Sequence, residues 1–172
     1  RCRSVVYSTD LTLCYSEGKM HARDNDERLI VVERGNVEFT RTETSYLEGI
    51  TFTIHEDGNI YAFGGQWNYG TTTQKMNTVY KIRVERVSWS PSDIVFLSWE
   101  KVPVSGLGPE GQVYTPIAAS DRELYVMSYK DKAYSVFILS LPTPISTTGV
   151  WSSMSVEVPG TGYVRHMESN GV

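Results

Sequence analysis

The residues best suited to chemistry lie in one polar stretch and one short insert. Trp67, Asn68 and Tyr69 follow one another between two expected strands. Two aromatic rings beside an amide make a flat surface that can contact a protein or a sugar. Trp89 lies in an insert at residues 85–94. We take these four as candidate binding residues; the alternatives are that Trp67 caps its own strands and that the insert is only a long hairpin tip.

The histidines point to structural roles. His21, His55 and His166 are single, and none has a second ligand at the spacing of a metal site. The sequence also has no Gly-x-Ser-x-Gly elbow, no phosphate-binding loop and no Ser-x-Asp-x-Gly repeat of the sialidase type. We therefore expect no catalytic residue, no metal site and no cofactor.

The two cysteines leave two interpretations open. Cys2 and Cys14 are too few for a metal site or a disulfide-rich scaffold. They fall on the two arms of an expected hairpin that turns near Ser8, close to opposite each other, so a cross-strand disulfide bond is geometrically feasible. A pair of buried free thiols fits equally well. The sequence does not indicate the cellular compartment.

The composition is that of a folded β protein. Of the 172 residues, 40% are hydrophobic and 12% aromatic, and the many Tyr and Trp favour strands over helices. The net charge of −4 comes from 16 basic and 20 acidic residues. No basic run is long enough to follow a phosphate backbone, which argues against a nucleic-acid partner. No stretch of about 18 apolar residues occurs, so we expect no membrane span.

Three segments share one order of strands and turns, which indicates an internal repeat. Strands are expected at residues 4–7, 11–15, 28–33 and 37–40, at 49–54, 60–63, 78–84 and 96–102, and at 113–118, 123–127, 134–139 and 151–156. Residues 21–28 alternate in charge and are expected to form a polar turn. Trp99 and Trp151 lie about 50 residues apart, the period of a four-stranded propeller blade. The pattern predicts an all-β fold of four-stranded antiparallel units.

The middle segment resembles a kelch repeat. Its strand Asn-Ile-Tyr-Ala-Phe at residues 59–63 ends in the pair Gly64 and Gly65, and Tyr80 and Trp99 follow in the order of that family. Paired glycines allow a sharp turn, and the Tyr and Trp can fill the space between neighbouring sheets. The other two segments keep the rhythm but lack the Gly pair. The resemblance implies a kelch-type β-propeller with blades at about residues 1–46, 47–104 and 105–159.

About three blades are fewer than a closed propeller contains. Residues 162–167 read as the first strand of a further blade, within residues 160–172. We therefore expect a partial propeller, completed by further blades or by another copy of the chain. In such a blade, residues 66–76 would link the second and third strands, on the same side as residues 105–111, and the insert at 85–94 would lie on the opposite side.

The resemblance favours a non-catalytic module that binds another protein through its propeller loops. One alternative is a carbohydrate-binding, lectin-like propeller that uses the aromatic stretch as a sugar platform. The other is a fragment of a galactose-oxidase-like enzyme, although the Tyr, His and Cys residues that such a copper site needs have no matching arrangement here.

Overall fold

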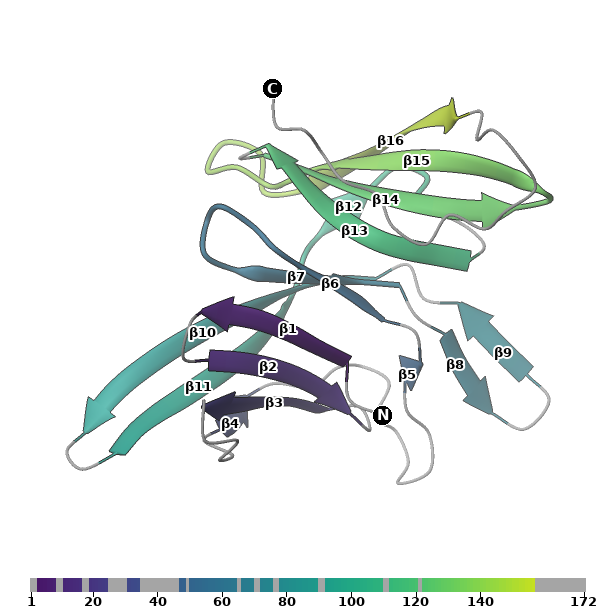
Figure 1. Ribbon diagram of the computed structural model, residues 1–172. Coiled ribbons are helices and arrows are strands. Elements are labelled where there is room, and N and C mark those ends of the chain that lie inside the picture. The colour runs from purple at the N-terminus through teal and green to yellow at the C-terminus, as the bar shows by residue number, and fades with distance from the viewer. Residues whose placement is uncertain are drawn as a thin grey trace.

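The computed structural model describes residues 3–8, 11–16, 19–24, 31–34, 47–48, 50–64, 66–69, 72–75, 78–89, 92–109, 112–120 and 122–156 (Figure 1). For some strand residues, among them 66–69, 72–75, 86–89 and 112–120, the backbone alone is described. The described residues form strands, turns and loops and include no helix. The expected all-β fold class is therefore confirmed.

The first sheet is an antiparallel meander of three strands. β1 (Arg3–Ser8) pairs with β2 (Leu11–Ser16), and β2 pairs with β3 (Lys19–Asp24). Because side chains alternate along a strand, one face of this sheet collects the apolar residues. These buried residues are Leu11, Leu13, Tyr15, Met20 and Ala22.

The position of β3 corrects the sequence analysis. Residues 28–33 were expected to form the third strand of this unit, and residues 21–28 to form a turn. The third strand is instead Lys19–Asp24, where the buried Met20 and Ala22 alternate with the more exposed His21 and Arg23. Met20 and Ala22 are the only apolar positions in this strand, so the alternation is too short to identify it from the sequence. The expected fourth strand at residues 37–40 lies outside the described residues.

The second sheet is an antiparallel meander of four strands with a fifth strand added in parallel. β6 (Thr51–Ile54), β7 (Ile60–Phe63), β10 (Val79–Trp89) and β11 (Ser92–Lys101) pair in this order. β4 (Val31–Arg34) runs parallel to β11 at the outer edge. Part of the segment expected as a strand of the first unit therefore belongs to the second sheet.

The third sheet has the same arrangement. β13 (Gln112–Ser120), β14 (Glu123–Lys130), β15 (Ala133–Ser140) and β16 (Gly149–Val156) form an antiparallel meander. β12 (Val104–Ser105) adds in parallel to β16. The strand orders β4-β11-β10-β7-β6 and β12-β16-β15-β14-β13 are thus equivalent, and the two four-stranded meanders expected here are present.

A fourth, smaller sheet lies beside the second one. It consists of β5 (Leu47–Glu48), β8 (Gln66–Tyr69) and β9 (Thr72–Lys75), in the order β5-β8-β9. β8 and β9 form a hairpin inserted between β7 and β10.

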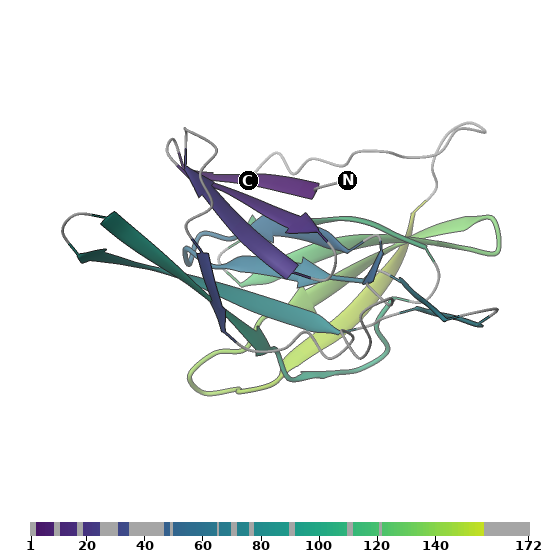
Figure 2. The ribbon, with the colours of Figure 1, turned by 90° about the horizontal axis from the view of Figure 1, so that it is seen from below.

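The first three sheets are stacked face to face (Figures 1 and 2). One hydrophobic core joins buried residues of the first and second sheets, and another joins those of the second and third sheets. β6 lies beside both β1 and β13, so the first strands of the three meanders are neighbours. The sheets do not close into a ring within the described residues.

Equivalent buried rows cross the second and third sheets. In each row, three apolar residues lie opposite one another on the second, third and fourth strands of the meander. The members are Ile60, Ile82 and Trp99 in the second sheet and Leu124, Leu139 and Trp151 in the third. The first row packs in the core shared with the first sheet, and the second row packs in the core shared with the second sheet. Each row therefore faces the preceding sheet.

The same aromatic contact recurs at both interfaces. Trp99 meets Tyr15 of the first sheet edge-on, with ring centroids 6.2 Å apart. Trp151 meets Phe63 of the second sheet edge-on at 5.3 Å. Tyr80 lies 5.6 Å from Trp99 in the same core. The tryptophans expected between neighbouring sheets are thus buried there.

Candidate functional site at the ends of the second sheet

The candidate residues Trp67, Asn68 and Tyr69 lie in β8 rather than in a loop. The hairpin β8–β9 leaves the second sheet where β7 ends and β10 begins, as expected for a link between the second and third strands. Its second arm carries Thr72 and Thr73, whose branched side chains favour a strand. Their strand preference explains why a polar stretch forms a hairpin. The side chains of the three candidates lie outside the described part of the structure.

The insert at residues 85–94 continues β10 and β11 as a paired hairpin. The last row shared with β7 contains Ile82 and Trp99. Seven further pairs follow in an unbroken register, from Arg83–Ser98 to Trp89–Ser92. At about 3.4 Å per residue this extension is roughly 24 Å long. It projects beyond the stacked sheets at the end opposite to β8–β9 (Figures 1 and 2), and the side chain of Trp89 at its tip is not described.

One edge of the projecting hairpin lacks a neighbouring strand within the described residues. β7 pairs with β10 only from Val79 to Ile82. Beyond Ile82, β10 pairs only with β11 among the described strands. The other arm is partly covered, because β4 pairs with residues 95–98 of β11.

The backbone of β10 turns polar groups toward this uncovered edge. The N–H of Val102, which follows β11, donates a hydrogen bond to the carbonyl oxygen of Val79 at 2.9 Å. Val79 therefore turns its backbone groups toward β11, and so does every second residue after it. The intervening residues Val84, Arg86 and Ser88 turn their N–H and C=O groups the other way.

Two ion pairs lie at the base of this hairpin. The Arg83 guanidinium contacts Glu100 Oε1 at 2.7 Å and Glu85 Oε1 at 3.5 Å. All three side chains are nearly half exposed, so each pair stabilises the fold by at most about 1 kcal/mol. They give the accessible part of the hairpin charges of both signs.

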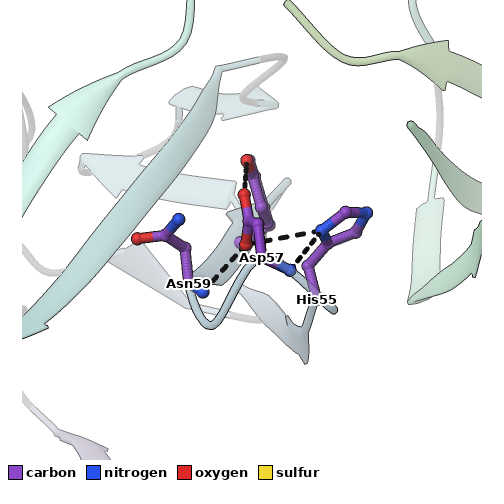
Figure 3. A network of polar contacts seen from close by, with 4 residues as sticks. His55, Asp57 and Asn59 are labelled. Atoms are coloured by element: carbon purple, nitrogen blue, oxygen red, sulfur yellow. Dashed lines mark hydrogen bonds and ion pairs between the residues drawn. The ribbon is translucent and has the colours of Figure 1, made fainter. Parts of the chain in front are cut away.

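The turn between β6 and β7, at the same end of the sheet, holds a polar network (Figure 3). Tyr61 donates its hydroxyl to Asp57 Oδ2 at 2.8 Å, and the backbone N–H of Asn59 donates to Asp57 Oδ1 at 2.8 Å. The backbone N–H of Asp57 donates to His55 Nδ1 at 3.2 Å. The buried His55 ring also lies edge-on to Tyr61, with centroids 5.5 Å apart.

The network moves two pKa values away from neutrality. Burial alone raises the pKa of Asp57, but the hydrogen bonds from Asn59 and Tyr61 and the nearby His55 outweigh it, so that pKa lies below its ordinary value. Burial and the bond to the Asp57 carboxylate raise the pKa of Tyr61 well above its ordinary range. A carboxylate and a phenol shifted in these directions are poor proton carriers near pH 7. The network is therefore suited to fixing the turn.

A simpler pair occurs in the third sheet. The Tyr125 hydroxyl donates to Glu123 Oε2 at 3.0 Å, two residues away on the same strand. The hydrogen bond, more than burial, raises the pKa of Tyr125. Tyr125 is half-buried, whereas Tyr61 is buried, and the Tyr125–Glu123 pair does not span a turn.

Within the described part of the chain, the remaining histidine and cysteine residues do not form a cluster. His21 lies half-buried on β3, and His166 is outside the described residues. The described part of the chain contains no group of three or more His, Cys, Asp or Glu that could hold a metal ion. Cys14 is buried and disulfide-bonded. Cys2 lies outside the described residues, so a bond between these two cysteines stays a prediction.

Sequence reasoning predicted a structural role for His55 but missed the network around Asp57. The available signal was the alternation of His55, Asp57, Asn59 and Tyr61 through an Asp-Gly-Asn turn, because Asp side chains commonly bond the backbone two residues on. The uncovered edge of β10 had no such signal, since it depends on where β7 stops.

Comparison with known proteins found no matching family model, no matching curated protein and no matching solved structure. Among the residues described here, no helix has the length and apolar character needed to cross a membrane.

Proposed function

We propose that this chain is a non-catalytic protein-binding module built from consecutive blades of a kelch-type β-propeller. Three stacked meanders, the equivalent strand orders of the second and third, and the proximity of their first strands support this arrangement. The glycine after β7 fits it as well. Gly64 is buried with φ of 74°, a backbone conformation that favours glycine at this turn.

The binding surface is the projecting β10–β11 hairpin. The observation that carries the proposal is its uncovered edge, where Val84, Arg86 and Ser88 turn backbone donors and acceptors outward. An extended segment of a partner protein pairs with such an edge as an additional strand. The outward N–H and C=O groups recur along β10 with the same spacing as the backbone groups of another extended polypeptide. The edge therefore favours a peptide over a sugar. Arg83 and Glu85 beside it provide charges that select among peptide sequences.

The test uses a displayed library of linear peptides, selected on the full chain. We expect peptides that bind in an extended form. Arg86→Pro should abolish their binding, because proline removes the outward N–H and its ring obstructs the edge. Arg86→Ala is the matched control, since it removes the charge but keeps the N–H, and it should retain most of the binding. Circular dichroism verifies that both variants keep the strand content.

Two outcomes would contradict this proposal. Equal binding by Arg86→Pro and Arg86→Ala would show that peptides do not use this edge. Binding on a glycan array that Trp67→Ala or Tyr69→Ala abolishes, with no peptide selected, would assign the module to carbohydrate and move the site to the β8–β9 hairpin.

A further inference from the structure

The outer face of the third sheet carries residues equivalent to a covered face of the second sheet. In the second sheet, Phe63 lies opposite Val79, whose carbonyl accepts the bond from Val102. In the third sheet, Met127 lies opposite Val136, which lies opposite Met154. In both sheets a tyrosine lies two positions earlier on the same strand: Tyr61 before Phe63, and Tyr125 before Met127. The equivalent sets are Tyr61, Phe63, Val79 and Val102, and Tyr125, Met127, Val136 and Met154.

The two sets differ in what covers them. All four members in the second sheet are buried in the core shared with the third sheet. In the third sheet, Met127 and Val136 are buried, but Tyr125 is half-buried and Met154 is 53% exposed, compared with 6% for Val102. No described sheet lies against them.

Further apolar side chains enlarge this surface. Ile138 lies opposite Tyr125 on β15 and is half-buried. Tyr129 and Tyr134 lie opposite each other, with ring centroids 4.7 Å apart, and both are half-buried. We call Tyr125, Met127, Tyr129, Tyr134, Val136, Ile138 and Met154 the outer face of the third sheet.

The first sheet shows the same relation. Tyr15 lies opposite Met20, as Phe63 lies opposite Val79. Tyr15 is covered by the second sheet, whose Trp99 meets it edge-on, and Phe63 is covered by the third sheet, whose Trp151 meets it edge-on. In both cases, the covering residues are an aliphatic–aliphatic–Trp row. The equivalent position on the outer face of the third sheet is Met127.

We propose that the outer face of the third sheet is the docking surface for a further antiparallel sheet of the same repeat. That sheet presents an aliphatic residue, a second aliphatic residue and a Trp on its second, third and fourth strands. The Trp lies against Met127, and thioether sulfur contacts aromatic rings favourably. Met154 becomes buried, as Val102 is in the second sheet.

Among the described residues, a second copy of this chain offers no matching surface. Both aliphatic–aliphatic–Trp rows are already buried within the chain. The other face of the first sheet carries Thr12, His21 and Arg23, which are half-buried or exposed, and polar groups lose hydration when an apolar face covers them. The inference uses only the repeat of the sheets and does not depend on what the β10–β11 hairpin binds.

The test joins a matching sheet to the full chain. A copy of residues 105–156, which contains the Leu124, Leu139 and Trp151 row, follows residues 1–172 through a flexible Gly-Ser linker. The copy carries Met127→Leu and Met154→Leu, so that Met154 of the original sheet can be followed alone. The readout is the rate of Met154 oxidation by hydrogen peroxide, measured by mass spectrometry. We expect the added sheet to slow it by at least about fivefold, because oxidation follows exposure.

A matched control separates docking from mere proximity. The same fusion with Trp151→Ala in the added copy should restore the fast oxidation of Met154. Equal rates in the fusion and in the chain alone overturn the proposal, whether or not the added copy folds elsewhere, because a sheet that fits this face should fold on it. A discrete dimer of the unmodified chain that protects Met154, detected by sedimentation, also overturns it and assigns the face to a second copy.

A second measurement uses the chain alone and does not depend on an added sheet. An apolar fluorescent dye should bind the outer face of the third sheet, and Met154→Glu should reduce its fluorescence severalfold by placing a charge there. Ile145→Glu is the control, because Ile145 is 99% exposed on the loop before β16, and it should leave the signal unchanged. An equal effect of both substitutions would contradict an apolar docking face.

Discussion

The second and third sheets have equivalent strand orders and equivalent buried rows, but their connections differ. The second sheet carries the β8–β9 hairpin between β7 and β10 and the long extension of β10 and β11. In the third sheet, β14 and β15 are joined by the two-residue turn Asp131–Lys132. The additions leave the sheet register between Ile60, Ile82 and Trp99 unchanged.

This difference shows where a stack of sheets tolerates sequence changes with little loss of stability. A residue in the row contacts two sheets, so a change there affects both, whereas a longer connection costs little because it lies at the end of a sheet. Features that distinguish one unit from the next therefore accumulate in the connections. The proposed binding surface, the β10–β11 hairpin, is one of these connections.

The largest expected effect tests the equivalence of the two rows. Trp99→Ala and Trp151→Ala should each lower the free energy of unfolding by about 3–5 kcal/mol, because each removes an aromatic side chain packed between two sheets. Urea unfolding followed by circular dichroism measures both. A loss below about 1 kcal/mol in only one variant would show that the two rows are not equivalent.

Substitution by Phe refines this comparison. The buried Trp99 Nε1–H has no hydrogen-bond partner among the described residues, so Trp99→Phe removes a polar group that costs free energy where it is. Trp151 is closely packed by Gly108, where a Cβ would lie 3.2 Å from the indole nitrogen. We expect Trp99→Phe to be the milder change of the two.

A smaller effect separates the two tyrosine–carboxylate pairs. Tyr61→Phe removes a bond to the partly buried Asp57 carboxylate, and we expect it to cost about 1.5 kcal/mol. Tyr125→Phe removes a bond between two half-buried residues, Tyr125 and Glu123, and its cost should stay within about 0.5 kcal/mol. Equal losses in thermal or urea unfolding would contradict the special role of the β6–β7 turn.

The Asp57–Tyr61 bond also predicts a pH dependence. The pKa of Asp57 is lowered by folding, so its contribution is present above the unfolded value of about 3.9 and is lost as the pH falls below it. The pKa of Tyr61 is raised by folding, so its contribution is present below about pH 10 and is lost as the pH rises further. Tyr61→Phe should flatten the alkaline part of the profile of unfolding free energy against pH.

The sequence predicted the regular parts of this fold well because alternation and turn residues are local signals. β7 was predicted with its observed bounds, Ile60–Phe63, and the third meander with small shifts at the strand ends. Local signals cannot show which sheet an edge strand joins, so the expectation that residues 28–33 form a strand of the first unit was wrong: β4 (Val31–Arg34) pairs with β11 of the second sheet. The hairpin β8–β9 was also missed. Its side chains are mostly polar, and its pairing with β5 is a long-range contact that no local pattern indicates.

The candidate site was predictable only in outline. The sequence indicated two elaborated connections on the second unit and gave their opposite placement correctly. It could not indicate that β10 continues as a paired strand as far as Trp89, well beyond the start of β7 at Ile60, because strand lengths in a sheet depend on the partner strand. Nor could it distinguish Tyr61 from Tyr125 by burial, since the difference arises from the sheet that covers each face.

The last comparison concerns two turns with the same backbone conformation and different residues. Gly58, in the β6–β7 turn, has φ of 79°, and Lys132, in the β14–β15 turn, has φ of 66°. Left-handed backbone costs a non-glycine residue about 1 kcal/mol.

Gly58→Ala should therefore destabilise the chain by about 1 kcal/mol through the backbone alone, because a Cβ there meets no atom within 4 Å. Lys132→Gly removes the strain of the left-handed conformation at this position and should stabilise the folded chain by up to about 1 kcal/mol. The larger conformational entropy of glycine in the unfolded chain reduces this gain. Opposite signs in urea unfolding are the expected result. A stabilising Gly58→Ala would show that the β6–β7 turn, and with it the Asp57 network, does not hold this conformation in solution.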